Sequence, residues 1–316
     1  MTEPTFLIGS LPVYGRLILA PMDGISTYPF RSLARDLGSA ISYSEFISAN
    51  DILHPPPNIE NHLLFHESER PMAYQLLDHD PERILKAAIQ LIERSPDLID
   101  LNLGCPARQV TSHGAGAALL KEPEKVSFII ESLVRALPVP VTAKIRLGWD
   151  EKSRNHVEIA RRLEDAGAAL IAVHGRTRSQ GYSGAVDWDA IAEVKSAVRI
   201  PVIANGNISS PDEVNQIFDH TGCEAVMIGR HAIGNPWIFS MRGRKDIAQE
   251  QTVLWLHELL NRLVTHYQVP VGVFRFRRYF VEITRPAPIA PPLRQRILSA
   301  LEPDEVHTLL DQILTA

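Results

Sequence analysis

The sequence predicts an α/β protein built as a (β/α)8 TIM barrel and followed by a small, all-helical C-terminal domain. Eight short strand candidates occur in roughly the first 230 residues, and most are continuously apolar, as parallel strands covered on both faces are. Amphipathic helical patterns fill most of the gaps between them, which is typical of βαβ units. This number of strands fits a (β/α)8 barrel of about 250 residues. A doubly wound open sheet is the alternative.

The expected strands are short apolar segments, and the expected barrel helices repeat apolar residues on one face. The strands are 17–21, 40–46, 72–76, 98–103, 141–145, 169–174, 202–205 and 225–228. The helices are 81–94, 123–137, 153–166, 188–198 and 211–218. Gly167 follows the third of these helices as a candidate C-cap.

The sequence after Met241 shows no strand signal and three further helical patterns. These are 250–267, 273–283 and 293–314, with the proline-rich segment 286–292 before the last. We therefore expect a catalytic barrel domain over residues 1–244 and a helical domain over residues 245–316.

Composition excludes several classes of protein. The net charge of −5 rules out a polycation, so a nucleic-acid surface would have to be local. Two distant cysteines, Cys105 and Cys223, suggest neither a disulfide framework nor a cysteine-rich zinc site, and no metal is expected. The N-terminal segment does not resemble a signal peptide, and the apolar runs are too short to cross a bilayer. We expect a soluble, cytoplasmic monomer.

Residues capable of chemistry follow the expected strands at their downstream ends, where a (β/α)8 barrel builds its active site. They are Pro21, Met22 and Asp23 after the first strand, Gln75 on the third, Asn102 and Cys105 after the fourth, Lys144 and Arg146 on the fifth, His174 and Arg176 after the sixth, Asn205, Gly206 and Asn207 after the seventh, and Gly229 and Arg230 after the eighth. The last two groups occupy the usual phosphate-binding loops of this fold. A single glycine loop would be read as a tight turn, but two at these strands favour phosphate.

Three side chains permit both a structural and a functional interpretation. Lys144 stands between apolar neighbours, so it must meet an anion, form a Schiff base or lose its charge, unless it reaches solvent at a strand edge. His174 alone would be a hydrogen-bonded core histidine. Free cysteines are usually small buried hydrophobes, which fits Cys223. Cys105, between Gly104 and Pro106, is instead displayed by its loop as a thiol acid.

Taken together, these motifs resemble the tRNA-dihydrouridine synthases. The matching stretches are Leu19-Ala20-Pro21-Met22-Asp23-Gly24 with Phe30-Arg31, Ser44-Glu45-Phe46, Asp100-Leu101-Asn102-Leu103-Gly104-Cys105-Pro106, Val141-Thr142-Ala143-Lys144-Ile145-Arg146-Leu147-Gly148-Trp149, Val173-His174-Gly175-Arg176-Thr177-Arg178, Ile203-Ala204-Asn205-Gly206-Asn207-Ile208 and Met227-Ile228-Gly229-Arg230. The combination is specific, although each piece alone is weak.

The resemblance implies an FMN-bearing barrel, NADPH as reductant and a helical domain that binds tRNA. The residues that would hold FMN are Pro21, Met22, Asp23, Gln75, Lys144, His174, Asn205, Gly206, Asn207, Gly229 and Arg230. Asn102 and Cys105 would face the target uracil. FMN, reduced by NADPH, would deliver hydride to uracil C6 while Cys105 protonates C5, after the uridine has been extruded from its stack.

The short C-terminal domain and Ser44-Glu45-Phe46 look most like the C-type bacterial branch, whose target is the D-loop uridine at position 16. Thr27 departs from the family pattern, which usually has Asp there, and we expect it to affect a helix start. The segment 271–283 matches no branch cleanly.

A local basic surface for tRNA is predicted from arginines interleaved with aromatic residues. Arg275, Arg277 and Arg278 lie in the helical domain, and Arg176 and Arg178 on the barrel. The aromatic residues are expected to be mostly core. The alternative functions are an FMN barrel acting on a free dihydropyrimidine or dihydroorotate-type molecule, a Schiff-base aldolase using Lys144, and a non-catalytic RNA-binding protein.

Overall fold

The computed structural model describes residues 3–285 and 289–315 and confirms the predicted fold class. Eight parallel strands form one curled sheet in the order β3-β10-β9-β8-β7-β6-β5-β4. They are β3 (Leu17–Leu19), β4 (Ser42–Ser48), β5 (Met72–Leu77), β6 (Leu98–Leu103), β7 (Val141–Arg146), β8 (Leu170–His174), β9 (Val202–Asn205) and β10 (Ala225–Ile228). A backbone hydrogen bond of 2.7 Å from Ala40 N to Leu17 O joins the segment before β4 to β3.

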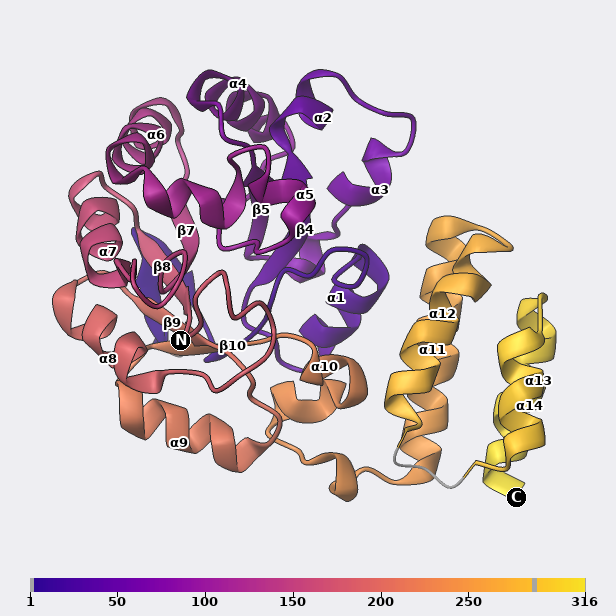
Figure 1. Ribbon diagram of the computed structural model, residues 1–316. Helices are drawn as coiled ribbons and strands as arrows, with labels where there is room; N and C mark the ends of the chain where they lie inside the picture. Colours follow the sequence, from indigo (N-terminus) through magenta and orange to yellow (C-terminus); the bar gives the residue numbers. More distant parts are fainter. Residues whose placement is uncertain (1–2, 286–288, 316) are drawn as a thin grey trace.

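Helices surround the sheet, and the predicted ones match to within a few residues (Figure 1). They are α4 (Pro81–Ile92), α6 (Pro123–Ala136), α7 (His156–Asp165), α8 (Trp188–Ala197) and α9 (Pro211–Thr221). Gly167 follows α7 at φ +92°, as a C-cap glycine does. Shorter helices are α1 (Tyr28–Asp36), α2 (Ala49–Leu53), α3 (Ile59–Leu63), η1 (Glu67–Glu69), α5 (Arg108–Thr111), η2 (Gly116–Lys121), α10 (His231–Gly234), η3 (Pro236–Ser240) and η4 (Arg244–Asp246). Thr27 is the N-cap residue of α1.

An N-terminal hairpin escaped prediction because its strands, β1 (Phe6–Ile8) and β2 (Leu11–Val13), are only three residues long. Gly9 adopts φ +60° in the two-residue turn. Phe6, Ile8 and Val13 pack into one apolar cluster with interior barrel residues such as Ile203. The hairpin thus contributes to the apolar core inside the barrel, while the polar strand ends lie elsewhere.

The C-terminal region consists of helices, as predicted. They are α11 (Gln249–Tyr267), α12 (Val271–Ile283), α13 (Pro291–Ser299) and α14 (Pro303–Thr315), and they stand beside the barrel in Figure 1. The single helix expected over 293–314 is wrong, because Pro303 starts a new helix and disfavours helical backbone in the residue before it. The proline-rich segment lies partly outside the described residues, at 286–288. None of the described helices has the length and apolar character needed to cross a membrane.

The helical region packs directly against the barrel. Residues from both parts belong to one buried apolar cluster, including Phe30 of α1 with Trp255 and Tyr279. The Tyr279 hydroxyl donates a 2.5 Å hydrogen bond to the carbonyl of Ile25, in the loop after β3. The domain boundary at 244/245 stays a prediction, but the two parts clearly share a core.

Candidate active site

A cavity of about 330 Å³ opens at the C-terminal ends of the strands, within the size range of small-ligand sites. Most of the residues predicted from the sequence line it. They are Pro21, Met22, Asp23, Gln75, Asn102, Cys105, Lys144, His174, Arg176, Asn205, Gly206, Asn207, Gly229, Arg230 and Arg278. The parallel sheet explains this convergence, because the carboxyl ends of all eight strands meet at one rim of the barrel.

Lys144 is held inside the cavity by an amide whose orientation is fixed. The Asn205 side chain donates from Nδ2 to the carbonyl of Met227 at 2.7 Å, so its Oδ1 faces Lys144 Nζ and accepts a hydrogen bond of 2.8 Å. Burial, with a smaller contribution from the neighbouring charge of Arg146, lowers the pKa of Lys144 to about 7. An anionic ligand would offset that loss of hydration and restore the charged form.

Further cations surround Lys144 in the cavity wall. Arg146 donates to the carbonyls of Gly104, Thr177 and Gly181 at 2.8 to 2.9 Å, and burial lowers its pKa to about 10. With Arg176, Arg230 and Arg278, the wall carries five cationic side chains against the single carboxylate of Asp23. The cavity therefore suits a ligand that carries negative charge.

Two cavity residues, Arg146 and Tyr182, had no assigned role in the predicted site, although Arg146 was named beside Lys144 on its strand. Arg146 follows Lys144 by two residues on β7, so the two-residue period of a strand could have placed it on the same face. Tyr182 lies in the long loop after β8, where no local pattern marks it. The guanidinium groups of Arg230 and Arg146 lie over the Tyr182 ring, with their Cζ atoms 4.9 Å and 5.5 Å from its centroid.

The wall near β8 and β9 has an unpartnered hydrogen-bonding atom and a glycine that is closely packed by neighbouring side chains. His174 Nε2 is buried and has no hydrogen-bond partner. Burial and four nearby cations, Lys144 first, hold the His174 pKa well below its usual value, so the ring is neutral. A Cβ at Gly206, where φ is +140°, would come within 2.8 Å of Val186 and 3.2 Å of the His174 ring.

Cys105 is half-buried and lies in the cavity wall, as its loop position predicted. Asn102 Oδ1 accepts hydrogen bonds from Gly104 N at 3.1 Å and from Cys105 N at 2.9 Å, which fixes the turn after β6. Burial raises the pKa of the Cys105 thiol, so it is protonated at neutral pH and able to donate a proton. Cys223 is fully buried, as expected for a structural cysteine.

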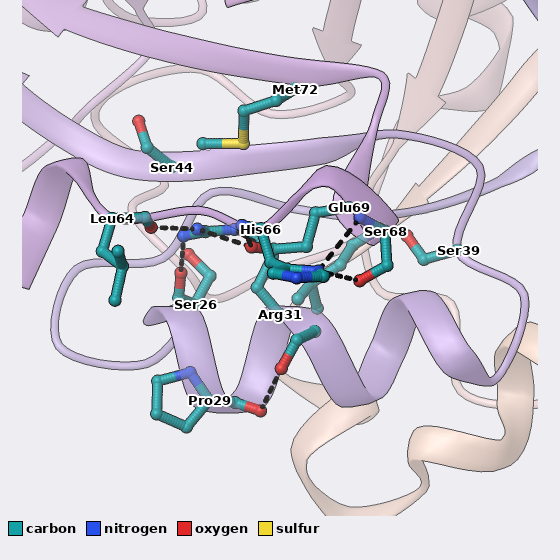
Figure 2. A network of polar contacts seen from close by, with 12 residues as sticks. Ser26, Pro29, Arg31, Ser39, Ser44, Leu64, His66, Ser68, Glu69 and Met72 are labelled. Atoms are coloured by element: carbon teal, nitrogen blue, oxygen red, sulfur yellow. Dashed lines mark hydrogen bonds and ion pairs between the residues drawn. The ribbon is translucent and has the colours of Figure 1, made fainter. Parts of the chain in front are cut away.

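Arg31 and Glu69 form a buried ion pair close to Ser26, which follows the cavity residues Met22 and Asp23 in sequence. Figure 2 shows this ion pair with Ser26 and Leu64. Arg31 Nε donates to Glu69 at 2.6 Å, and its other nitrogens donate to the carbonyls of Ser26 and Leu64. The Ser26 hydroxyl accepts a 2.8 Å hydrogen bond from Met22 N. The conformation of the cavity loop thus depends on a charge pair that is removed from water.

The arginines predicted to bind tRNA differ in the contacts that they make within the protein. Arg278 is exposed and reaches the cavity wall. Arg275 stacks on Tyr267 at 4.2 Å, and Arg277 covers Phe274 at 4.6 Å and donates to the carbonyl of Ala300. Arg178 covers Trp149 and donates to Thr111 Oγ1 at 3.0 Å. Phe276, Tyr279 and Phe280 are buried as predicted, whereas Phe274 is exposed.

Within residues 3–285 and 289–315, no group of three or more histidine, cysteine or acidic side chains is arranged to hold a metal ion.

Comparison with known proteins identifies the relatives of this chain. The profile of the family described as Dihydrouridine synthase (Dus) matches residues 18–315. The chain is 42% identical over 232 residues to tRNA-dihydrouridine synthase B of Pseudomonas aeruginosa, covering 73% of this chain and 70% of the relative. It is 34% identical over 319 residues to the probable tRNA-dihydrouridine synthase 1 of Synechocystis, covering 98% and 89%.

A solved structure of 2-naphthoyl-CoA reductase in complex with 2-naphthoyl-CoA has a TM-score of 0.60 at 10% identity, covering 74% of this chain and 51% of that one. At this identity, the likeness shows a shared fold and nothing of the ligand.

Proposed function

The chain belongs to the dihydrouridine synthase family of flavin-dependent oxidoreductases that act on tRNA, and on this premise we propose that it uses FMN and NADPH to reduce the C5=C6 bond of a tRNA uridine. The observation that carries the proposal is the convergence of Cys105, Lys144 and Arg230 on one cavity. A thiol acid, a cation near the reacting ring and a phosphate partner are the groups that this reaction requires.

The residues present fit a flavin nucleotide. The unpartnered His174 Nε2 offers a hydrogen bond, and the absence of a side chain at Gly206 lets Val186 and the His174 ring pack against its backbone beside the cavity. FMN would be held by Pro21, Met22, Asp23, Gln75, Lys144, His174, Asn205, Gly206, Asn207, Gly229 and Arg230, which all line the cavity. Of these, Arg230 with the loops at Gly206-Asn207 and Gly229 would hold the phosphate.

Bound FMN, once reduced by NADPH, supplies the hydride. The protein provides the proton and the charge. Cys105 Sγ holds a proton at neutral pH and donates it to uracil C5, while Asn102 keeps the Cys105 turn in place. Lys144, aimed by Asn205 Oδ1, offers a positive charge where negative charge develops during the reaction.

The tRNA must present an extruded uridine, because a base stacked in folded RNA cannot enter a cavity at the barrel rim. Arg278 and Arg176 in the wall, with Arg178 and Arg275 outside it, would contact the RNA. Arg277, which donates to the carbonyl of Ala300, would not. The sequence predicts position 16 from its likeness to the C-type branch. Of the two synthases reported above, one carries the B name and the other the number 1, so neither supports that branch. Cytoplasmic location and a monomeric state also stay predictions.

The test follows the flavin absorbance of the purified protein after anaerobic reduction with NADPH. We expect unmodified bulk tRNA to reoxidise the flavin, and free uracil or orotate to leave it reduced. Rapid reoxidation by the free pyrimidine would instead favour a small-molecule enzyme. A colourless protein that binds no FMN, and that traps an aldehyde or ketone under borohydride, would favour a Schiff-base aldolase. Mapping dihydrouridine in tRNA from cells lacking this protein then identifies the target position.

A further inference from the structure

A buried carboxylate, Asp100, lies beneath the cavity on β6. It is fully buried, and its side chain shares the interior-facing side of the strand with Leu98 and Asn102. Asp100 Oδ1 accepts a 2.6 Å hydrogen bond from the Thr142 hydroxyl, and Oδ2 accepts one of 2.7 Å from Gln75 Nε2. Apolar side chains fill much of the interior around it, so burying a charged carboxylate here costs free energy, which its hydrogen bonds reduce.

Asp100 begins a chain of hydrogen bonds that ends at Cys105. Gln75, anchored by Asp100 through Nε2, accepts a 2.8 Å hydrogen bond at Oε1 from Asn102 Nδ2. Asn102 then accepts from the backbone N–H groups of Gly104 and Cys105 at Oδ1. We call this series, from Asp100 through Gln75 and Asn102 to the Cys105 turn, the amide relay.

The chemistry of its two ends leaves the amide relay a single orientation. Burial raises the pKa of Asp100 to about 6, so above that pH its oxygens can only accept, and Gln75 must turn its NH2 group toward them. At the other end, two backbone N–H groups can only donate, so Asn102 must turn its oxygen toward them. Neither amide can flip without placing two donors or two acceptors against each other.

We infer that Asp100 is a positioning residue for Cys105: through Gln75 and Asn102, its carboxylate holds the turn that aims the thiol into the cavity. Asp100 does not touch the cavity itself. The inference rests on the proposed role of Cys105 as proton donor. A displacement of about 1 Å at a reacting group can cost on the order of a hundredfold in rate.

Three size-related variants test the inference in the flavin-loaded protein. Asp100→Leu removes the anchor but suits the apolar interior. Asp100→Asn keeps a carbonyl oxygen for Gln75, and its NH2 group can donate to the Thr142 hydroxyl. Thr142→Val removes the other hydrogen bond of Asp100 and leaves the amide relay intact, which makes it the matched control for lost polarity in the core.

Two readouts are needed, because a variant that only loosens packing would not change both of them in the pattern given below. The first is single-turnover reoxidation of the reduced flavin by tRNA. The second is the rate at which iodoacetamide alkylates Cys105 between pH 6 and 10, with Cys105→Ala as blank. For Asp100→Leu we expect reoxidation to slow by about tenfold to a hundredfold. Alkylation should become faster with a lower pH midpoint, because a loosened turn exposes the thiol.

Asp100→Asn should keep most of the parent reoxidation rate. Thr142→Val should reoxidise within about threefold of the parent rate. The inference is overturned if folded Asp100→Leu keeps the parent rate and alkylation profile, or if Thr142→Val falls as far as Asp100→Leu. Should Asp100→Leu not fold, the smaller Asp100→Ala decides by the same readouts. If tRNA does not oxidise even the parent flavin, the proposed function fails, and the alkylation profiles still decide whether Asp100 positions Cys105.

Discussion

The rim of the barrel and the arginine-rich helix α12 contrast in how far local sequence determines where a side chain lies. At the rim, residues as far apart in sequence as Pro21 and Arg230 line one cavity. On α12, arginines that are neighbours in sequence separate, so that Arg278 reaches the cavity while Arg277 turns to the carbonyl of Ala300. A strand end in a parallel barrel has its location set by topology. A helix face depends on which neighbours pack against it.

The largest expected effect tests the rim at Cys105. Cys105→Ala removes the proposed proton donor, so the rate of tRNA reduction should fall by about 100- to 10,000-fold. FMN content should remain that of the parent, because the thiol is not among the residues proposed to hold the cofactor. Single-turnover reoxidation by tRNA measures the rate, and Cys223→Ala, at a fully buried cysteine, serves as control. A Cys105→Ala protein that reduces tRNA at the parent rate would remove the acid role.

The strands were predictable from sequence because most are runs of apolar residues covered on both faces. The rim followed from them, since topology alone brings Cys105 and Lys144 into one cavity. Other features depend on contacts that no local pattern encodes. The β1–β2 hairpin is too short for a periodic signal, and Tyr182 reaches the cavity from an irregular loop. The amide relay needs three strand positions in register, which only the folded barrel supplies.

A second prediction concerns Lys144. Lys144→Met should slow tRNA reduction by about 100- to 1,000-fold, as loss of one preorganised charge does. Lys86→Met, on the exposed face of α4, should have no effect on the rate. An unchanged rate for Lys144→Met would mean that the cation does not act on the reacting ring.

Lys144 should also affect how the unfolding free energy of the FMN-free protein depends on pH. Its folded pKa of about 7 lies below the unfolded value of about 10.4. Between these values the unfolded chain binds more protons, so the parent should gain stability as pH rises relative to Lys144→Met. Urea unfolding midpoints of both proteins from pH 6 to 10 measure the difference, and parallel curves would contradict the lowered pKa.

The third prediction separates backbone strain from a clash with the side chains beside Gly206. Gly206→Ala should weaken FMN binding by tenfold or more, because its Cβ would press on Val186 and the His174 ring. Gly222→Ala is the matched control, since Gly222 also has positive φ, at +64°, but no atom within 4 Å of the added carbon. Both variants should lose about 1–2 kcal/mol of stability to strain, and Gly206→Ala should lose more because of the clash. Fluorescence titration with FMN distinguishes them, and equal affinities would show that displacing the His174 ring does not affect FMN binding.

The smallest expected effect tests the helix itself. Arg278 is exposed at the cavity, so Arg278→Ala should remove a phosphate contact and reduce the salt dependence of tRNA binding by about one unit of slope. Arg277 donates to Ala300 O and covers Phe274, so Arg277→Ala should leave that slope unchanged. It should instead cost about 0.5–1.5 kcal/mol of unfolding free energy through the lost hydrogen bond. The two variants are compared by tRNA binding measured from 50 to 200 mM salt and by thermal unfolding. If both slopes fall equally, Arg277 and Arg278 both contact the RNA. The sequence would then predict the location of side chains on this helix as well as it predicts those at the barrel rim.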